Sequence, residues 1–542
     1  STNAAGAKSA TVTVPATSSS SLTGTYYLWI KAGTLSDVSG NTSNQVVSSA
    51  FKFDNTNPSL SVSTNKTTKS ITAVATASAT SGISKYEFSK DNGATWVNNG
   101  TSNTYTFTGL THNTSYNIKV RVTSGVGRQT TSATVATTTN AIPTPTYSST
   151  NNGEVVVSYP SGCGSTYTCT YIKDGGSAVT VTSNPTIYFG TNGTLIAKVS
   201  DGTNTVTAST YSVVRNDLYV SSSGNDTTGY GTINKPYATI QKAYDSANTT
   251  ATIKVMNDLN ISSSINFSAN KTITLTSYST TGAVNTAKKA KAVNSVLLTV
   301  SAGALNLYNI VIDGNGISDP GGLIEITNDA SFSANNGVTI KNAVSTYLYG
   351  GAIRSTGYKR SIVIDGATFI NNKAPGGGAI HSTNLTLKSG TVSNNTSTNG
   401  SGGGIYICGN LTINGGSINE NTSTGSGGGI MFDVTVDECK GTFTMTDGSI
   451  YNNKTPTSSG NGGGGILISG GITATISGGS IYGNTSFQGG GIYIQPGGKL
   501  YFNGGKISSN TAADHGGGIL NWNGTYINGG GVLTGNSPDN II

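Results

Sequence analysis

The chain has 542 residues, which is enough for several domains, and it contains 74 glycines but only 10% charged residues. Its net charge of +7 is small for this length, and its one tight basic cluster (Lys288, Lys289 and Lys291) lacks interleaved aromatics. We interpret that cluster as a solvated turn, which disfavours nucleic acid as a partner because a basic stripe would be expected. No apolar run approaches the ~18 residues of a membrane span. The sequence opens as if inside a domain, so we expect a fragment of a longer exported protein.

Short apolar strands alternate with Gly, Asn and Ser turns in the first part of the chain, as is typical of β-sandwiches. Residues 1–57 end in FKFDNTNP, which resembles the last strands and linker of bacterial Ig-like repeats. In residues 58–140, Leu110 stands six positions before Tyr116, a spacing that resembles the tyrosine corner of fibronectin type III domains. The resemblance implies that Trp96 and Tyr116 are core residues rather than ligand contacts.

Residues 141–215 are predicted to form a third, small Ig-like β module after the linker AIPTPT. Cys163 and Cys169 stand six residues apart on strands that we expect to be neighbours, and no other Cys or His lies near them in the sequence. We therefore predict a disulfide that closes a small hairpin, in an oxidising compartment, rather than a metal site.

The sequence changes character at residue 216. A helix is predicted over 236–247, with Pro236 at its start and Ile240, Ala243 and Tyr244 on one apolar face. The segment DLYVSSSGNDTTGYGTINKPYATIQKA resembles the opening of pectate-lyase-like β-helix proteins. This resemblance implies that the helix caps the first coil and shields its strand edges and apolar core.

A glycine-rich motif that ends in isoleucine repeats through the C-terminal part. The repeat isoleucines stand at 353, 380, 405, 430, 466, 492 and 519, at intervals of 27, 25, 25, 36, 26 and 27 residues. A second strand follows each motif, as at 411–413, and a third apolar position lies three residues before an asparagine, as in Ile418 and Asn421. Three strands per coil predict a right-handed parallel β-helix over 216–542, with asparagine amides stacked at the corners.

The Gly-Gly-Ala-Ile and Phe-x-x-Asn patterns over 350–542 resemble the repeats of polymorphic outer-membrane proteins and other adhesin-like bacterial β-helix proteins. The predicted fold class is therefore all-β, with tandem Ig-like and fibronectin III sandwiches followed by a capped parallel β-helix. The resemblance implies an extracellular or cell-surface protein with a structural or adhesive role.

Two features lie in or next to the 36-residue interval between Ile430 and Ile466. Cys408 and Cys439 fall in successive coils just before the second strand, so we predict a disulfide between them, with buried free thiols as the alternative. The insertion holds the closest acidic group, Asp433, Asp437 and Glu438. This group is a hypothetical Ca²⁺ site, with an ordinary solvated loop as the alternative, and no other cofactor is expected.

Two outward columns are predicted from strand alternation. The first is Arg354, His381, Tyr406, Met431, Leu467, Tyr493 and Leu520. Its apolar part is either an exposed contact surface or lies under the insertion before Ile466. The second is Thr386, Thr412, Thr444, Thr475, Tyr501 and Tyr526. Contacts with a glycan or a protein are predicted at Tyr406, Met431, Tyr493, Tyr501, Trp522 and Tyr526.

No catalytic residue is predicted. Asp514 and His515 are adjacent but have no visible partner in the sequence, and Arg354 has no evident carboxylate neighbour. The sequence favours a non-catalytic bacterial protein that binds host or environmental glycan or protein, or identical subunits in a filament. Two alternatives stay open, namely a secreted polysaccharide lyase or glycoside hydrolase of the pectate-lyase-like superfamily, and a phage receptor-binding fibre.

Overall fold

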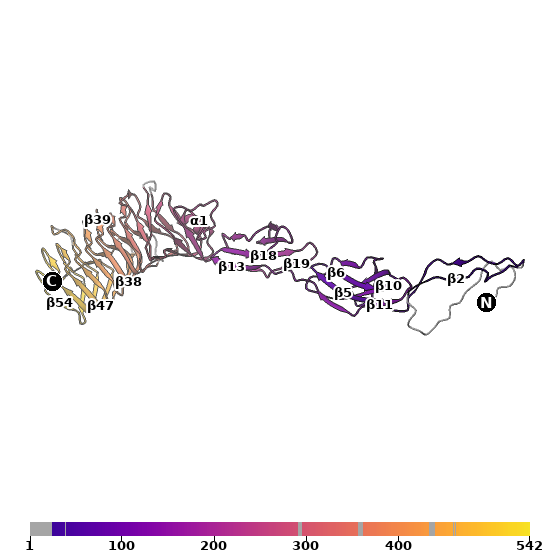
Figure 1. Ribbon diagram of the computed structural model, residues 1–542. Helices are drawn as coiled ribbons and strands as arrows, with labels where there is room; N and C mark the ends of the chain where they lie inside the picture. The colour runs from indigo at the N-terminus through magenta and orange to yellow at the C-terminus, as the bar shows by residue number, and fades with distance from the viewer. Residues whose placement is uncertain are drawn as a thin grey trace. The chain divides into compact units, whose positions relative to one another are not determined.

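A computed structural model describes residues 24–37, 39–290, 295–355, 361–432, 439–458, 460 and 462–542 (Figure 1). The regular secondary structure of these residues consists of strands apart from one short helix, α1 (Ile240–Ser246), so the predicted fold class is confirmed. The chain divides into two compact units. The first comprises Ser1–Ser148, Val156–Pro185 and Thr194–Tyr211, and the second Ser149–Val155, Thr186–Gly193 and Ser212–Ile542.

A fibronectin III-like sandwich lies in the first unit. One sheet contains β5 (Ser59–Lys66), β6 (Ile71–Ser78) and β9 (Thr104–Phe107). The other contains β7 (Ile83–Ser89), β8 (Val97–Asn98), β10 (Ser115–Ser124), β11 (Gln129–Thr131) and β12 (Val135–Thr138). Ile71, Phe88 and Val120 are fully buried in the core. The Thr111 N–H donates to Tyr116 Oη at 3.0 Å, which confirms the tyrosine corner.

Trp96 does not belong to this core, so that prediction is wrong. Asn98 pairs with Glu87 on β7, and because side chains alternate along a strand, Trp96 shares the outer face with Glu87. The Arg121 guanidinium carbon lies 4.6 Å from the centre of the Trp96 ring, and Arg121 Nε donates to Glu87 at 2.9 Å. Trp96 is therefore half-buried under an arginine instead of between the two sheets.

The small β module places β15 (Thr168–Lys173) between β16 (Val179–Val181) and β18 (Gly193–Ser200). Cys163 and Cys169 form the predicted disulfide, with their Cα atoms 5.5 Å apart. Cys169 is fully buried against Ile142 and Val199, so the bond lies beside the small core that it helps to close.

The helix α1 begins four residues later than predicted. Tyr237 forms a β-bridge with Val220, so the chain at Pro236 is still extended. Thr239 is the N-cap, and its Oγ1 accepts the Lys242 N–H at 3.1 Å. The apolar face is as predicted, because Ile240, Ala243 and Tyr244 are buried in the solenoid core.

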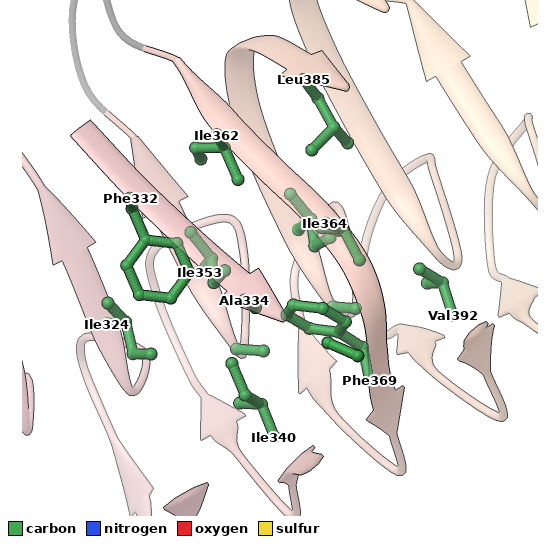
Figure 2. Packing of buried hydrophobic residues seen from close by; sticks show 14 of the residues in the cluster. Ile324, Phe332, Ala334, Ile340, Ile353, Ile362, Ile364, Phe369, Leu385 and Val392 are labelled. Atoms are coloured by element: carbon green, nitrogen blue, oxygen red, sulfur yellow. The ribbon is translucent and has the colours of Figure 1, made fainter. Parts of the chain in front are cut away.

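From β21 (Asp217–Val220) to β54 (Val532–Thr534), parallel strands stack into a β-solenoid, seen as successive arrows beyond α1 in Figure 1. One coil comprises β40 (Ile405–Ile413), β41 (Ser417–Asn419) and β42 (Thr422–Ser423) before β43 (Ile430–Phe432) opens the next. The predicted repeat isoleucines from 353 to 519 pair with one another in register. Figure 2 shows how inward side chains such as Phe332, Ile364 and Phe369 fill the interior.

Buried asparagines form a continuous ladder along one corner, which confirms the predicted amide stacking. Its members are Asn372, Asn395, Asn421, Asn453, Asn484, Asn510 and Asn536. Asn421 Nδ2 donates to Asn453 Oδ1 and to the Val392 carbonyl, both at 2.9 Å. Asn421 Oδ1 accepts from the backbone N–H and the side-chain amide of Asn395, at 3.0 and 2.9 Å. Each interior amide is therefore satisfied, as a buried polar group requires.

The second predicted disulfide, Cys408–Cys439, is also confirmed, with a Cα–Cα distance of 4.2 Å. It joins β40 to the segment just before β44 (Thr442–Met445), in the next coil. The hypothetical Ca²⁺ ligands Asp433, Asp437 and Glu438 lie outside the described residues.

Replacing one ladder amide should destabilise the solenoid. In Asn453→Ala, the Asn421 amide and the Ile418 carbonyl lose their partners inside a buried corner. We expect a loss of roughly 3 kcal/mol, because each unsatisfied buried group costs about 1–3 kcal/mol. Urea denaturation measures the change against Thr444→Ala, an outward control that should cost under about 0.5 kcal/mol. Equal midpoints for the two variants would show that the ladder is not needed for stability.

Candidate functional site

The residues that follow the repeat isoleucines form one column from Arg354 to Leu520, as predicted. Part of this column is buried, so only some of its members can form an exposed contact surface. Tyr406, Leu467 and Leu520 are only 8%, 1% and 4% exposed. Met431 and Tyr493 are half-buried, so ligand binding at these two and at Tyr406 stays a prediction, with Tyr406 the least accessible of the three.

Glycine loops cover this column. A Cβ on Gly377 would lie 2.9 Å from the Tyr406 Cβ, and one on Gly462 would lie 2.1 Å from Tyr493 Cδ1. The close approach requires glycine, which has no side chain to collide. The Tyr349 ring centre lies 5.0 Å from that of Tyr406, so this tyrosine is enclosed by neighbours of its own chain.

The second column has the predicted register from Thr386 to Tyr501 but not at its last member. Tyr526 pairs with Leu500 and packs against the core, whereas Ile527 takes the outward place and is 47% exposed. Tyr526 follows Ile519 by seven residues, whereas Leu500 follows Ile492 by eight. A turn shortened by one residue moves every following side chain to the opposite face.

The other predicted residues do not converge on one site. Trp522 is 51% exposed, and its backbone N–H donates to the Ile494 carbonyl at 2.8 Å, whereas Tyr501 is half-buried in the second column. His515 Nδ1 lies 2.5 Å from Asp514 Oδ1, and Asp514 Oδ2 accepts from Gln488 Nε2 at 2.7 Å. Arg354 does have a carboxylate partner, because its Nη1 lies 3.0 Å from Glu325 Oε1 in the neighbouring coil. Within the described ranges, no three His, Cys, Asp or Glu gather to hold a metal ion.

A polar groove runs along the outside of the ladder corner, and we call it the ladder groove. One hollow of about 640 Å³ is lined by Lys288, Asp313, Asn315, Gly316, Asn342, Val344, Asn371, Lys373 and Asn394. A second, of about 410 Å³, is lined by Asn394, Glu420, Thr422, Asn452, Lys454 and Gly483. Asn394 belongs to both, so the groove continues across several successive coils.

The backbone explains why amides line this groove. Asn371, Asn394, Glu420 and Asn452 precede ladder asparagines and have φ values of 58°, 54°, 56° and 53°. This left-handed bend turns the next side chain into the corner and leaves its own side chain exposed. Asparagine adopts this conformation more readily than most residues. The Asn-Asn pairs at 371–372, 394–395 and 452–453 are the sequence pattern from which this column of exposed residues could have been predicted.

Charged groups complete the ladder groove, and a pair of tyrosines lies next to its bend in sequence. Glu420 accepts from Asn394 Nδ2 at 3.1 Å, while the side chains of Lys373 and Lys454 are exposed. Tyr451 and Tyr482, one residue before the bend in successive coils, stack with ring centres 4.9 Å apart and planes within 1°. Burial raises the pKa of the Tyr451 hydroxyl above its ordinary value.

This arrangement repeats polar groups along the solenoid. Its amide, ammonium and carboxylate groups lie on successive coils, which are about 4.8 Å apart. They therefore offer hydrogen-bond donors and acceptors to an extended polymer with repeating units.

The left-handed bend can be tested at Asn371. Asn371→Val should cost about 1–2 kcal/mol because a β-branched residue is strained at positive φ. Asn371→Gly should be close to neutral, because glycine adopts this conformation without a steric penalty. Thermal unfolding compares the two variants with the unmodified chain. A valine variant as stable as the glycine variant would contradict the assigned backbone.

No protein-family model and no curated protein matches the chain. Among solved structures, the fibronectin(III)-like modules of Clostridium thermocellum CbhA share 18% identity, covering 29% of this chain and 94% of theirs, with a TM-score of 0.14. The chicken CNTN1 FN1–FN3 domains share 14% identity, covering 33% of this chain and 72% of theirs, with a TM-score of 0.16. The strand order and register described above therefore define the fold, which combines fibronectin III-like modules with a parallel β-solenoid.

Proposed function

We propose that this chain is a non-catalytic, extracellular bacterial adhesive protein whose solenoid binds an extended glycan in the ladder groove. The observation that carries the proposal is the repetition of exposed Asn side chains at one backbone position over successive coils. A repeated set of amides can contact successive units of a polymer in the same way. A compact metabolite would use only one coil of such a groove.

The chemistry of the groove favours a glycan over a protein partner. Its lining is dominated by amides, lysines and carboxylates, and Val344 is its one aliphatic side chain among the residues that line the two hollows. Protein interfaces have cores rich in aromatic and apolar side chains. Hydroxyl groups of sugars match amide donors and acceptors, and the stacked Tyr451 and Tyr482 offer an aromatic edge beside them.

An extracellular location is supported by cysteine usage. All four cysteines of the chain are paired in disulfides. Such bonds persist in oxidising surroundings and are rare in the cytosol. Within the described residues, no helix is long and apolar enough to cross a membrane.

The engagement of the groove carboxylates supports a non-catalytic role. Asp313 accepts from Asn342 Nδ2 at 3.0 Å and lies 3.7 Å from Lys341 Nζ. Glu420 accepts from Asn394. Each of the two hollows is lined by one carboxylate that accepts a hydrogen bond from a neighbouring amide, whereas glycoside hydrolysis uses two carboxyl groups that flank one glycosidic bond.

The proposal predicts that glycan binding depends on the groove amides. The triple variant Asn371→Gly, Asn394→Gly, Asn452→Gly keeps the left-handed backbone and removes three side-chain amides. Its affinity should fall about tenfold or more, because each lost hydrogen bond contributes about 1 kcal/mol and 1.4 kcal/mol is a factor of ten. A glycan array identifies the bound polymer class, and affinity electrophoresis in gels containing pectin or alginate measures binding.

The matched control is Thr412→Ala, Thr444→Ala, Thr475→Ala on the second outward column, which should bind like the unmodified chain. Equal binding by both triple variants, with loss of binding in Trp522→Ala, would move the site to the exposed Trp522. Shortening of the polymer during the assay would favour the lyase or hydrolase alternative. Absence of binding to every glycan tested would overturn the proposal.

A further inference from the structure

The early coils contain a buried ion pair where the sequence predicts a solvated basic turn. Lys289 ends β26 (Thr286–Lys289), and Asp319 ends β30 (Ser318–Asp319). Their side chains are only 1% and 2% exposed, and Lys289 Nζ contacts Asp319 Oδ2 directly. The prediction is therefore wrong for Lys289. Lys289 follows the inward-facing Ala287 by two residues, so strand alternation directs the Lys289 side chain into the solenoid interior.

The surroundings stabilise a charged pair poorly. Lys289 Nζ has one further acceptor, the Ser295 carbonyl at 2.7 Å. Asp319 Oδ1 has no hydrogen-bond partner among the described residues. A buried carboxylate with one unsatisfied oxygen is costly in an apolar interior. Transfer of the proton from the ammonium group to the carboxylate removes both charges and leaves an amine against a carboxylic acid.

We propose that Lys289 and Asp319 are joined by an isopeptide bond. The neutral Nζ attacks Cγ of the protonated Asp319, so that an Nζ–Cγ bond forms and the Cγ–Oδ2 bond breaks. Oδ2 leaves as water, with the proton that it received from the ammonium group and a second proton from the nitrogen, and Oδ1 becomes the amide oxygen. The remaining N–H stays with the Ser295 carbonyl, which already holds it in the reactant geometry. No oxidant or further reactant is required.

The bond has a clear place in the fold. β30 is the edge strand of the short parallel sheet β30–β34–β37–β39–β42, and its partner within this sheet is β34 (Val344–Ser345). An isopeptide bond would fasten this edge to β26 of the preceding coil and prevent it from separating. Cys408–Cys439 similarly joins successive coils in the later part of the solenoid. The inference is independent of what the ladder groove binds.

Intact-mass spectrometry of the purified full chain provides the test. The expected mass is one water lower than the sequence mass, after allowance for the hydrogens lost in the two disulfides. A protease digest should contain a branched peptide that joins the segments of Lys289 and Asp319. Lys289→Arg and Asp319→Ala should each regain the water, whereas Asp313→Ala should keep the loss, because the Asp313 carboxylate lies 3.7 Å from Lys341 Nζ.

The unmodified chain alone can decide the question if a variant fails to fold. Its full sequence mass, without the loss of water, would overturn the proposal. Retention of the loss in Lys289→Arg would also overturn it, because an aspartyl succinimide elsewhere would then account for the missing water. The branched peptide separates these cases, since a succinimide joins no two segments.

Discussion

The stacking of asparagine side chains between coils, from Asn372 onward, is the constraint on which the later coils of the solenoid depend. A ladder amide such as Asn453 is buried, and most of its hydrogen-bond partners belong to the coils on either side. A single coil therefore cannot satisfy its own corner, and each added coil satisfies the previous one. Because the amide must meet its neighbour in register, the ladder also fixes the alignment of the strands that lead into the corner.

The same constraint creates the surface that we propose binds glycan. The chain must turn sharply for Asn395 or Asn453 to point inward, and the residue before each one adopts positive φ to make that turn. The side chain at the bend is then left outside, in a column whose spacing is that of the ladder. The proposed binding residues Asn394 and Asn452 are thus placed by a structural requirement, while the residue type at the bend is free to vary, as Glu420 shows.

Much of this architecture could be predicted from apolar and asparagine periodicity. The columns through Ile405 and Asn421 follow from spacing alone. The Cys408–Cys439 disulfide follows from the coil positions of its cysteines, and Cys163–Cys169 follows from their six-residue spacing on neighbouring strands. The errors have local physical causes. A turn one residue shorter reverses the face of Tyr526, and glycine loops enclose Tyr406, which strand alternation by itself does not reveal. The ladder groove was missed because its residues repeat in backbone conformation rather than in hydrophobicity. A contact between distant segments, as at Lys289 and Asp319, has no periodic signal.

Hydrogen–deuterium exchange of the full chain, with and without the polysaccharide selected on the array, tests the central claim most directly. Bound glycan should slow exchange in peptides that cover the ladder groove at 371–373, 394–396, 420–422 and 452–454, coil after coil. The exchange rate of peptides that cover the outward threonine column at 412, 444 and 475 should stay unchanged. Slower exchange confined to the threonine column, or to the end that carries Trp522, would contradict the assignment of the groove as the binding surface.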